Sequence, residues 1–491
     1  MSDLLDDVVA AAGLTVFGVA SAARPVGAPT PLPFLPGPEL TDRIAAVRPR
    51  GLDRVVLCGP GAGAAAIAAT LGLDLTVLDT ADPHRVRAAL ADRLERTVVV
   101  LAVPEPTVVA DAHRRAFLQA FEDAGLHDVG RRFVVVTAPG SGFETVAREM
   151  GAPLFLAPPT TSALSAYALV PAGLAGADTA ALLAEAAAFQ APPPPRAAAG
   201  FAAAAPRRAG PAAEPAAEPV AEPVLPGVAL GETIAAAVRD GRDKLAVAPD
   251  GTGIDGLGPW IERLFGDAVV TVALENPSSW GHEGPDVLGV TVGGVLGRAI
   301  MPGGGIMPDL SVNGPLGAHL FAWEQAAIVA GAAPRPTGDG DALLHRLDSG
   351  GPAGAPALVE GAIEVYGETT ATTLIAAIDG LARTVPPGGR VAIEAHLDQG
   401  GDAAASGVRD ALGGRVSRAV TFGWGPRAAP GTGATLLITG AVTHDVPVPG
   451  RPYTFGELQA ASAAPGDGPW LRLHLTDRAT GIEQLLAALG G

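Results

Sequence analysis

The stretch Asp53–Gly72, DRVVLCGPGAGAAAIAATLG, carries the clearest signal of the fold of this chain. It opens with a short apolar run, Arg54–Cys58, whose β-branched residues are typical of a buried strand. Alternate glycines then indicate a turn, and Ala64–Leu71 has the composition of a packed helix. A strand, a glycine turn and a helix place backbone N–H groups at the carboxyl edge of a parallel sheet. α/β folds bind anions or cofactors at that edge.

The glycine turn itself has two interpretations. Its backbone N–H groups suit a phosphate, but Pro60 has no N–H to donate. A tight strand-to-helix turn without a ligand is therefore the favoured interpretation, and a phosphate cradle is the alternative. Cys58, the single cysteine, lies in the buried-strand pattern and is expected to be structural.

The composition excludes several classes of function. The net charge of −18 argues against a surface for nucleic acid or an anionic membrane. No apolar run reaches the roughly 20 residues of a membrane span, and the acidic N-terminus lacks a secretory signal, so a cytoplasmic location is expected. The histidine spacing and the lone cysteine fit no metal site, and no cofactor is expected.

Secondary-structure patterns divide the chain into five segments. Residues 1–50 are expected to form a helix at Asp3–Ala12, a Pro-rich crossing and a second helix at Pro38–Val47. Strands alternate with helices over 51–186 and again over 228–450, which predicts doubly wound parallel sheets. The Pro/Ala/Glu-rich stretch 187–227 predicts a disordered linker, and 451–491 is expected to pack on the two lobes. The predicted fold is α/β, with two α-β-α sandwich lobes.

Several ordered blocks resemble the glucose-6-phosphate isomerase family, in the bacterial form often fused to transaldolase. They span about residues 40–476 and include VVLCGPGAG, VVVTAPGSGFETVAREMG, SALSAYALVPAGLAGAD, LGAHLFAWEQAAIVAG, FGWGPR and PVPGRPYTFGELQ. The resemblance implies two sugar-isomerase (SIS) lobes, each a parallel sheet between helices. It identifies the glycine turn as the first loop of such a lobe.

The same resemblance implies that the phosphate-binding residues have been lost. Two serines of the family's first glycine turn fall at Gly63 and Ala64. The family's hydroxyl-rich second loop corresponds here to Leu101–Thr107, LAVPEPT, which keeps only its final threonine. Apolar side chains, two prolines and a glutamate do not suit a dianion. The residues left to contact a ligand are expected to be Gly59, Gly61, Gly63, Thr107 and Ser162.

The catalytic positions are similarly depleted. Isomerisation through an enediol needs a carboxylate base, ring-opening acid/base groups and a cation. The resemblance places Asp267 at the base, one methylene shorter than the family's glutamate, and His319 at a ring-opening histidine. The family's arginine has no counterpart, and its lysine falls at Leu437. From the residues alone, a core or surface histidine is the favoured interpretation of His319.

These observations predict an isomerase-like protein that is catalytically impaired or inactive and acts as a structural or regulatory partner in sugar-phosphate metabolism. We expect a homodimer, or a hetero-oligomer with an active paralogue or a related sugar-phosphate enzyme, and at most weak binding of a sugar phosphate. One alternative is a working aldose–ketose isomerase with a diverged site that uses Asp267 and His319. Another is a sensor of a non-phosphorylated, sugar-like ligand.

Overall fold

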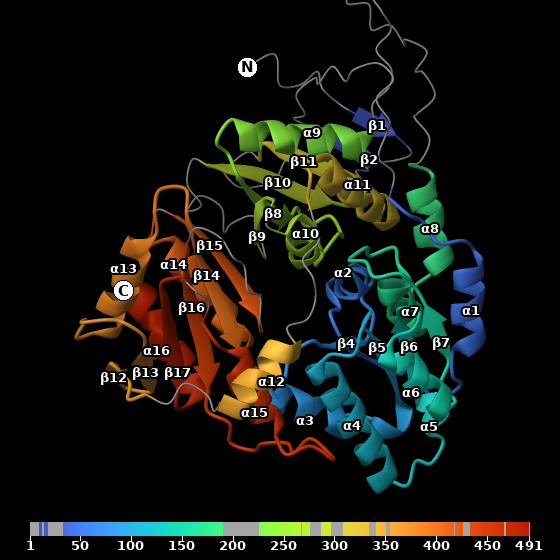
Figure 1. Cartoon of the computed structure of the whole chain (residues 1–491). Coiled ribbons are helices and arrows are strands. Elements are labelled where there is room, and N and C mark those ends of the chain that lie inside the picture. Colours follow the sequence, from blue (N-terminus) through green and yellow to red (C-terminus); the bar gives the residue numbers. More distant parts are fainter. Residues whose placement is uncertain are drawn as a thin grey trace, which may run out of the picture.

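The structure is a computed structural model that describes residues 9–11, 14–17, 33–189, 225–266, 268–274, 286–295, 308–332, 340–349, 354–416, 418–425, 433–465 and 468–490. Its strands form three sheets, and each sheet with its helices occupies its own part of the molecule (Figure 1). Asp267 and most of the predicted linker, 190–224, lie outside the described residues. Within the described part of the chain, no helix is long and apolar enough to cross a membrane.

The first sheet is wholly parallel and has the order β4-β3-β5-β6-β7. Every residue of its three central strands is buried because helices cover both faces. Its strands are β3 (Arg54–Cys58), β4 (Leu75–Leu78), β5 (Thr97–Ala102), β6 (Phe133–Thr137) and β7 (Leu154–Leu156). The accompanying helices are α1 (Glu39–Val47), α2 (Ala62–Leu71), α3 (Pro83–Ala91), η1 (Leu94–Arg96), α4 (Val108–Asp123), α5 (Val129–Arg132), α6 (Gly142–Met150), α7 (Ala166–Ala175) and α8 (Thr179–Ala187).

The second sheet has the order β1-β2-β11-β10-β8-β9. Its parallel strands are β8 (Lys244–Pro249), β9 (Val270–Ala273), β10 (Val287–Gly293) and β11 (Leu310–Asn313), with helices α9 (Pro226–Arg239), α10 (Leu257–Phe265) and α11 (Leu316–Val329). An N-terminal hairpin of β1 (Val9–Ala11) and β2 (Leu14–Phe17) pairs antiparallel with β11. The helix predicted over Asp3–Ala12 is therefore wrong at Val9–Ala11. Pairing with β11 satisfies N–H and C=O groups that an exposed edge strand leaves open.

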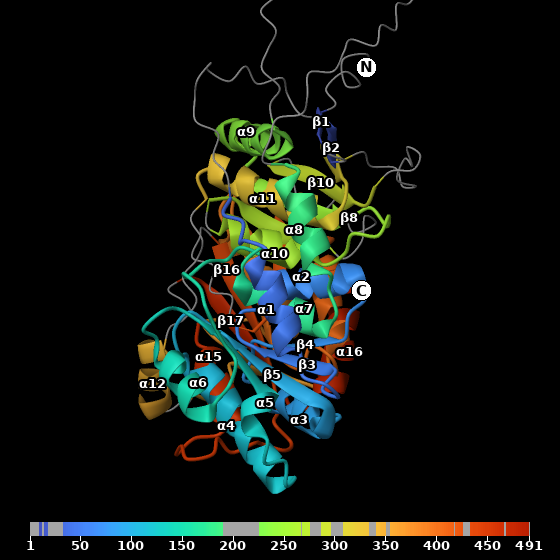
Figure 2. The same ribbon diagram turned by 90° about the vertical axis from the view of Figure 1, so that its right-hand side faces the viewer.

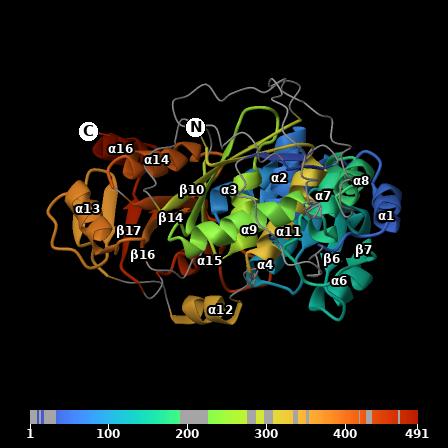
Figure 3. The ribbon, with the colours of Figure 1, turned by 90° about the horizontal axis from the view of Figure 1, so that it is seen from above.

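The third sheet has the order β12-β13-β17-β16-β14-β15. Its parallel strands are β14 (Arg390–His396), β15 (Ala419–Trp424), β16 (Gly433–Gly440) and β17 (Trp470–Leu475), and β12 (Leu358–Glu360) and β13 (Ile363–Tyr366) extend it antiparallel. The remaining helices are α12 (Gly340–Ser349), α13 (Leu374–Thr384), η3 (Ala403–Ser406), α14 (Gly407–Gly413), α15 (Phe455–Ser462) and α16 (Arg478–Gly490). This part lies to one side of the other two (Figure 3).

The α/β class with parallel sheets is confirmed, but the expected division of the chain differs from the structure. The segment 228–450, predicted as one lobe, contributes to two separate sheets. The C-terminal segment 451–491 does not merely pack on the lobes, because β17 lies inside the third sheet between β13 and β16. Local patterns predicted these strands, and long-range pairing decides which sheet each of them joins.

One continuous apolar core joins the first and second sheets. Between these sheets, α2 packs against the start of α10, as Figure 2 shows. Gly256 has φ +72°, and a Cβ placed there would lie 2.8 Å from the Cβ of Ala69. Helix α8, which follows the first sheet in the chain, reaches across to α11, where the Glu185 carboxylate accepts a hydrogen bond from Gly317 N at 2.8 Å. The first two parts are thus fixed against each other at several points.

Candidate functional site

The glycine turn lies where the sequence predicts, between β3 and α2, but packing alone accounts for its first two glycines. Gly59 has φ +137°, and a Cβ there would lie 2.5 Å from the carbonyl oxygen of Ala102. A Cβ on Gly61 would lie 2.6 Å from Val77 and 2.7 Å from Leu57. The neighbouring strands leave no room for a Cβ at either position. Packing therefore accounts for both glycines without a ligand.

Gly63 is enclosed by a different segment, the loop that leads into α7. A Cβ on Gly63 would lie 2.9 Å from the Cβ and 3.0 Å from the Cα of Ala163. Carbon atoms in ordinary contact are about 3.5–4 Å apart, so a serine here needs the loop to move. The position at which the resemblance expects a ligand-holding hydroxyl is occupied by a side chain of the protein itself.

The second loop, Leu101–Thr107, is also held by contacts within the protein. Ala102 and Val103 are buried. The carbonyl of Pro104 accepts hydrogen bonds from Thr137 Oγ1 and Ala138 N, both at 3.0 Å. Thr107 is the N-cap of α4, and its hydroxyl oxygen accepts a hydrogen bond from Ala110 N at 3.1 Å. The one threonine retained in this loop therefore has a capping role in the structure.

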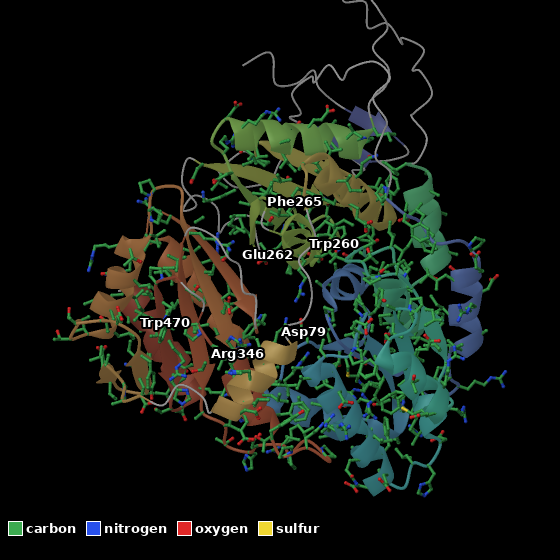
Figure 4. The ribbon with its side chains drawn as sticks, viewed as in Figure 1. Asp79, Trp260, Glu262, Phe265, Arg346 and Trp470 are labelled. Atoms are coloured by element: carbon green, nitrogen blue, oxygen red, sulfur yellow. The ribbon has the colours of Figure 1, made fainter. Side chains whose placement is uncertain are left out.

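A pocket of about 50 Å³ lies between the glycine turn, the second loop and α10. Ligand pockets for small molecules usually measure roughly 300–1,000 Å³, so this space is small for a hexose phosphate. Trp260 Nε1 donates to the carbonyl oxygen of Thr161 at 3.4 Å, and Arg263 lies 3.6 Å from the Asp79 carboxylate. Asp79 and Trp260 are labelled in Figure 4. The lining residues are Pro60, Ala62, Gly63, Ala102, Pro104, Thr160, Thr161, Tyr167, Trp260 and Arg263.

His319, the predicted ring-opening residue, is fully buried on α11 and does not line this pocket. Its Nε2 lies 2.8 Å from the carbonyl oxygen of Gly293, which can only accept, so Nε2 carries the proton. Burial lowers the pKa of His319 to about 4, and the ring is therefore neutral near pH 7. Asp267, which the resemblance places at the base, lies outside the described residues.

Ser162 contacts a residue that sequence reasoning did not select. Its Oγ donates to Glu324 Oε1 at 2.7 Å, and Ala163 N donates to the same oxygen at 3.0 Å. Burial raises the pKa of Glu324 to about 7, against the opposing effect of the hydrogen bonds from Ser162 and the adjacent backbone. The available signal was a glutamate in the middle of the apolar run LFAWEQAA. A charged residue inside such a pattern needs a buried partner.

Other reactive groups lie away from the pocket. Lys244, the single lysine, is buried at the start of β8, where its Nζ lies 2.6 Å from Asp243 and 2.5 Å from Asp286. Burial raises the pKa of the Cys58 thiol, which keeps it protonated. Among the described residues, no group of histidine, cysteine, aspartate and glutamate has the arrangement of a metal site.

Comparisons with known proteins find similar solved structures, at low sequence identity and with TM-scores below 0.5. No protein-family model and no curated protein matches the chain. A hypothetical protein from Thermus thermophilus is similar at TM-score 0.46 and 19% identity, over 64% of this chain and 87% of the other. A glucose-6-phosphate isomerase from Chlamydia trachomatis is similar at TM-score 0.42 and 16% identity, over 63% and 71%. At these TM-scores neither likeness carries an inference about substrate or residue roles.

Proposed function

We propose that this chain does not catalyse aldose–ketose isomerisation and acts instead as a structural or regulatory partner in sugar-phosphate metabolism. The observation that carries the proposal is the closure of the glycine turn. Ala163 fills the space beside Gly63, and the pocket that remains there measures about 50 Å³. A cytoplasmic location is part of the same proposal.

The chemistry of the pocket supports this proposal. An enediol mechanism needs a base, a proton shuttle and a cation close to one substrate. Among the described residues, no carboxylate and no histidine lines the pocket, and the Arg263 guanidinium lies beside the Asp79 carboxylate. His319 is neutral and bonded to a backbone carbonyl. The described lining of the pocket therefore offers neither a carboxylate base nor a histidine shuttle for moving a proton between adjacent carbons.

The direct test is an isomerase assay on the purified full chain. We expect no interconversion of glucose 6-phosphate and fructose 6-phosphate above the buffer rate. An authentic glucose-6-phosphate isomerase, added to the same preparation, controls for inhibitors. Turnover at an ordinary enzymatic rate contradicts the proposal, and Asp267→Ala then tests whether that residue is the base.

The partner role is tested by adding the chain to an active glucose-6-phosphate isomerase from the same organism. We expect a complex of defined mass by light scattering and a change in kcat or KM of the active enzyme. A homodimer of this chain alone, with no effect on the enzyme, supports the oligomer but contradicts the regulatory role. Bovine serum albumin at equal concentration controls for crowding.

A sensor of an uncharged, sugar-like ligand is the second candidate. The lining favours it over a phosphate site, because Thr160, Thr161 and Tyr167 contribute hydroxyl groups and the Arg263 guanidinium lies beside the Asp79 carboxylate. Thermal-shift measurements with matched sugars, with and without phosphate, distinguish the two ligand classes. A rise in Tm that does not need phosphate supports the sensor, and the absence of any rise contradicts it.

A further inference from the structure

The loop Thr160–Leu164 connects the first sheet to α7 and contacts the second part of the molecule. Its Ser162 hydroxyl and Ala163 amide both donate to Glu324 on α11, at 2.7 and 3.0 Å. The carbonyl of Thr161 accepts from Trp260 on α10 at 3.4 Å. Two helices of the second part therefore hold one loop of the first part.

This loop also closes the pocket. Thr160 and Thr161 are part of the pocket lining, and Ala163 is the residue that leaves no room for a side chain at position 63. The contact made by Glu324 and the closure of the glycine turn thus depend on the same few residues. If the Glu324 contact breaks, the loop loses the hydrogen bonds that hold Ser162 and Ala163 against α11.

Glu324 is held by hydrogen-bond donors without a cation. It is 5% exposed, and its two described donors are a neutral hydroxyl and a backbone amide. The elements packed against α11 carry charged groups of their own, but none of them contributes to the shift in the pKa of Glu324, which follows from burial and hydrogen bonds. Those groups are Glu185 on α8, Glu232 and Arg239 on α9, and Glu262 and Arg263 on α10.

Because the Glu324 carboxyl group is buried, its contact with loop Thr160–Leu164 depends on pH. In the closed loop the pKa of Glu324 is about 7, whereas a solvated glutamate has a value of 4.5. The closed form therefore binds a proton more tightly than any form in which this side chain meets water. As pH rises from 4.5 through 7, the open form gains the proton-linked advantage.

We propose that Glu324 is a titratable latch, which holds loop Thr160–Leu164 closed over the glycine turn when it is protonated and releases the loop when it ionises. Exposure of the pocket and of the Ser162 and Ala163 donors is then greater in alkaline than in mildly acidic solution. The latch goes beyond the proposed function, since it operates whether or not the chain has a partner or an activity.

Hydrogen exchange of the Ala163 amide measures the latch directly on the full chain. After correction for the intrinsic pH dependence of exchange, we expect the protection factor of peptides covering 160–164 to fall between pH 5 and pH 8. The expected fall is roughly tenfold to a hundredfold, the range set by the difference between the two pKa values. A protection factor independent of pH overturns the proposal.

Three variants separate titration of Glu324 from general loosening. Glu324→Gln keeps an oxygen acceptor but cannot ionise, so its protection should not vary with pH. Glu185→Gln removes another carboxylate between the first and second parts, the one that accepts from Gly317 N. Its protection factor should vary with pH as in the wild type. Ser162→Ala removes a donor that favours the ionised form, so the fall should move to higher pH. The latch is contradicted if the protection factor of Glu324→Gln falls with pH as in the wild type. It is also contradicted if the pH of the fall is the same in Ser162→Ala as in the wild type.

Discussion

The carboxyl edges of the first and third sheets have the same strand arrangement and are closed in different ways. In each sheet, the parallel strand that comes first in the chain lies between the second and the third. Loops leave in opposite directions at that point and create a crevice in which open α/β sheets usually bind ligands. In the first sheet, Ala102, Ala163 and the glycine turn fill the crevice by apolar and backbone contact.

In the third sheet the corresponding crevice holds a buried ionic network. Arg478, at the start of α16, donates to the carbonyl of Ala441 at 3.0 Å and forms ion pairs with Asp402 at 3.0 Å and Asp82 at 2.8 Å. Asp82 is fully buried at the N-cap of α3 in the first part, and it also accepts from Gln459 at 2.7 Å. This edge is therefore closed by charge and joins two parts of the molecule.

Strand order thus creates a crevice but does not assign it a ligand. Apolar closure offers few directed donors and tolerates no added volume. Ionic closure tolerates no lost partner, because each remaining charge stays buried. Substitutions at the two edges should therefore destabilise the protein for opposite reasons. At the first sheet the cause is excess volume, and at the third sheet it is an unpaired charge.

The largest effect is expected at the third sheet. Arg478→Met removes the cation between Asp82 and Asp402 and should lower the free energy of unfolding by about 3–5 kcal/mol, since it leaves buried carboxylates uncompensated. Urea unfolding followed by circular dichroism measures the loss. Arg415→Met is the matched control, because its pair with Asp379 is about a third exposed and should contribute less than about 1 kcal/mol. Equal losses in the two variants contradict the comparison.

The next effect depends on pH and is specific to Glu324. Its pKa is raised by burial, so the stability that it contributes is fully present below pH 4.5 and is lost as pH rises through 7. Between pH 5 and pH 8, the free energy of unfolding of the wild type should fall by roughly 2 kcal/mol relative to that of Glu324→Gln. The difference between the two proteins removes the contribution of the buried histidines His113 and His319, because both proteins contain them. Burial lowers their pKa values, so their contribution to the free energy of unfolding rises with pH.

At the first sheet, added volume should be the damaging change. Gly63→Ser forces its side chain against Ala163 and should cost about 1–3 kcal/mol, without creating a site for glucose 6-phosphate. Adding Ala163→Gly to the same chain should recover much of that loss. Gly354→Ser, at a glycine with nothing within 4 Å, should be close to neutral. Binding of glucose 6-phosphate by Gly63→Ser in calorimetry contradicts this interpretation of the turn.

The smallest effect is expected at Thr107. Thr107→Ala deletes the hydroxyl that caps α4 and should cost about 1 kcal/mol. Thr107→Ser keeps a capping oxygen and should retain most of the stability. Thermal unfolding of the two variants side by side measures the difference. Equal melting temperatures contradict the capping role that the structure gives this residue.

Much of the local structure could be predicted from the sequence. The apolar run Arg54–Cys58, the glycine turn and the Ala-rich helix lie where their composition predicts, since each depends on neighbours a few residues away. The pattern also indicated that Pro60 and the residues of Leu101–Thr107 do not suit a phosphate. Thr107 was predicted to contact a ligand, but the sequence did not reveal its capping role.

The α/β class, the alternation of strands and helices and the place of the glycine turn follow from the sequence alone. Three further findings needed the folded chain: the strands form three sheets, Val9–Ala11 is a strand, and Ala163 lies against Gly63 while its amide donates to Glu324. They depend on contacts between residues far apart in the sequence. Periodicity and turn chemistry act over a few residues, whereas strand pairing and burial of a carboxyl depend on segments as far apart as Ser162 and Glu324.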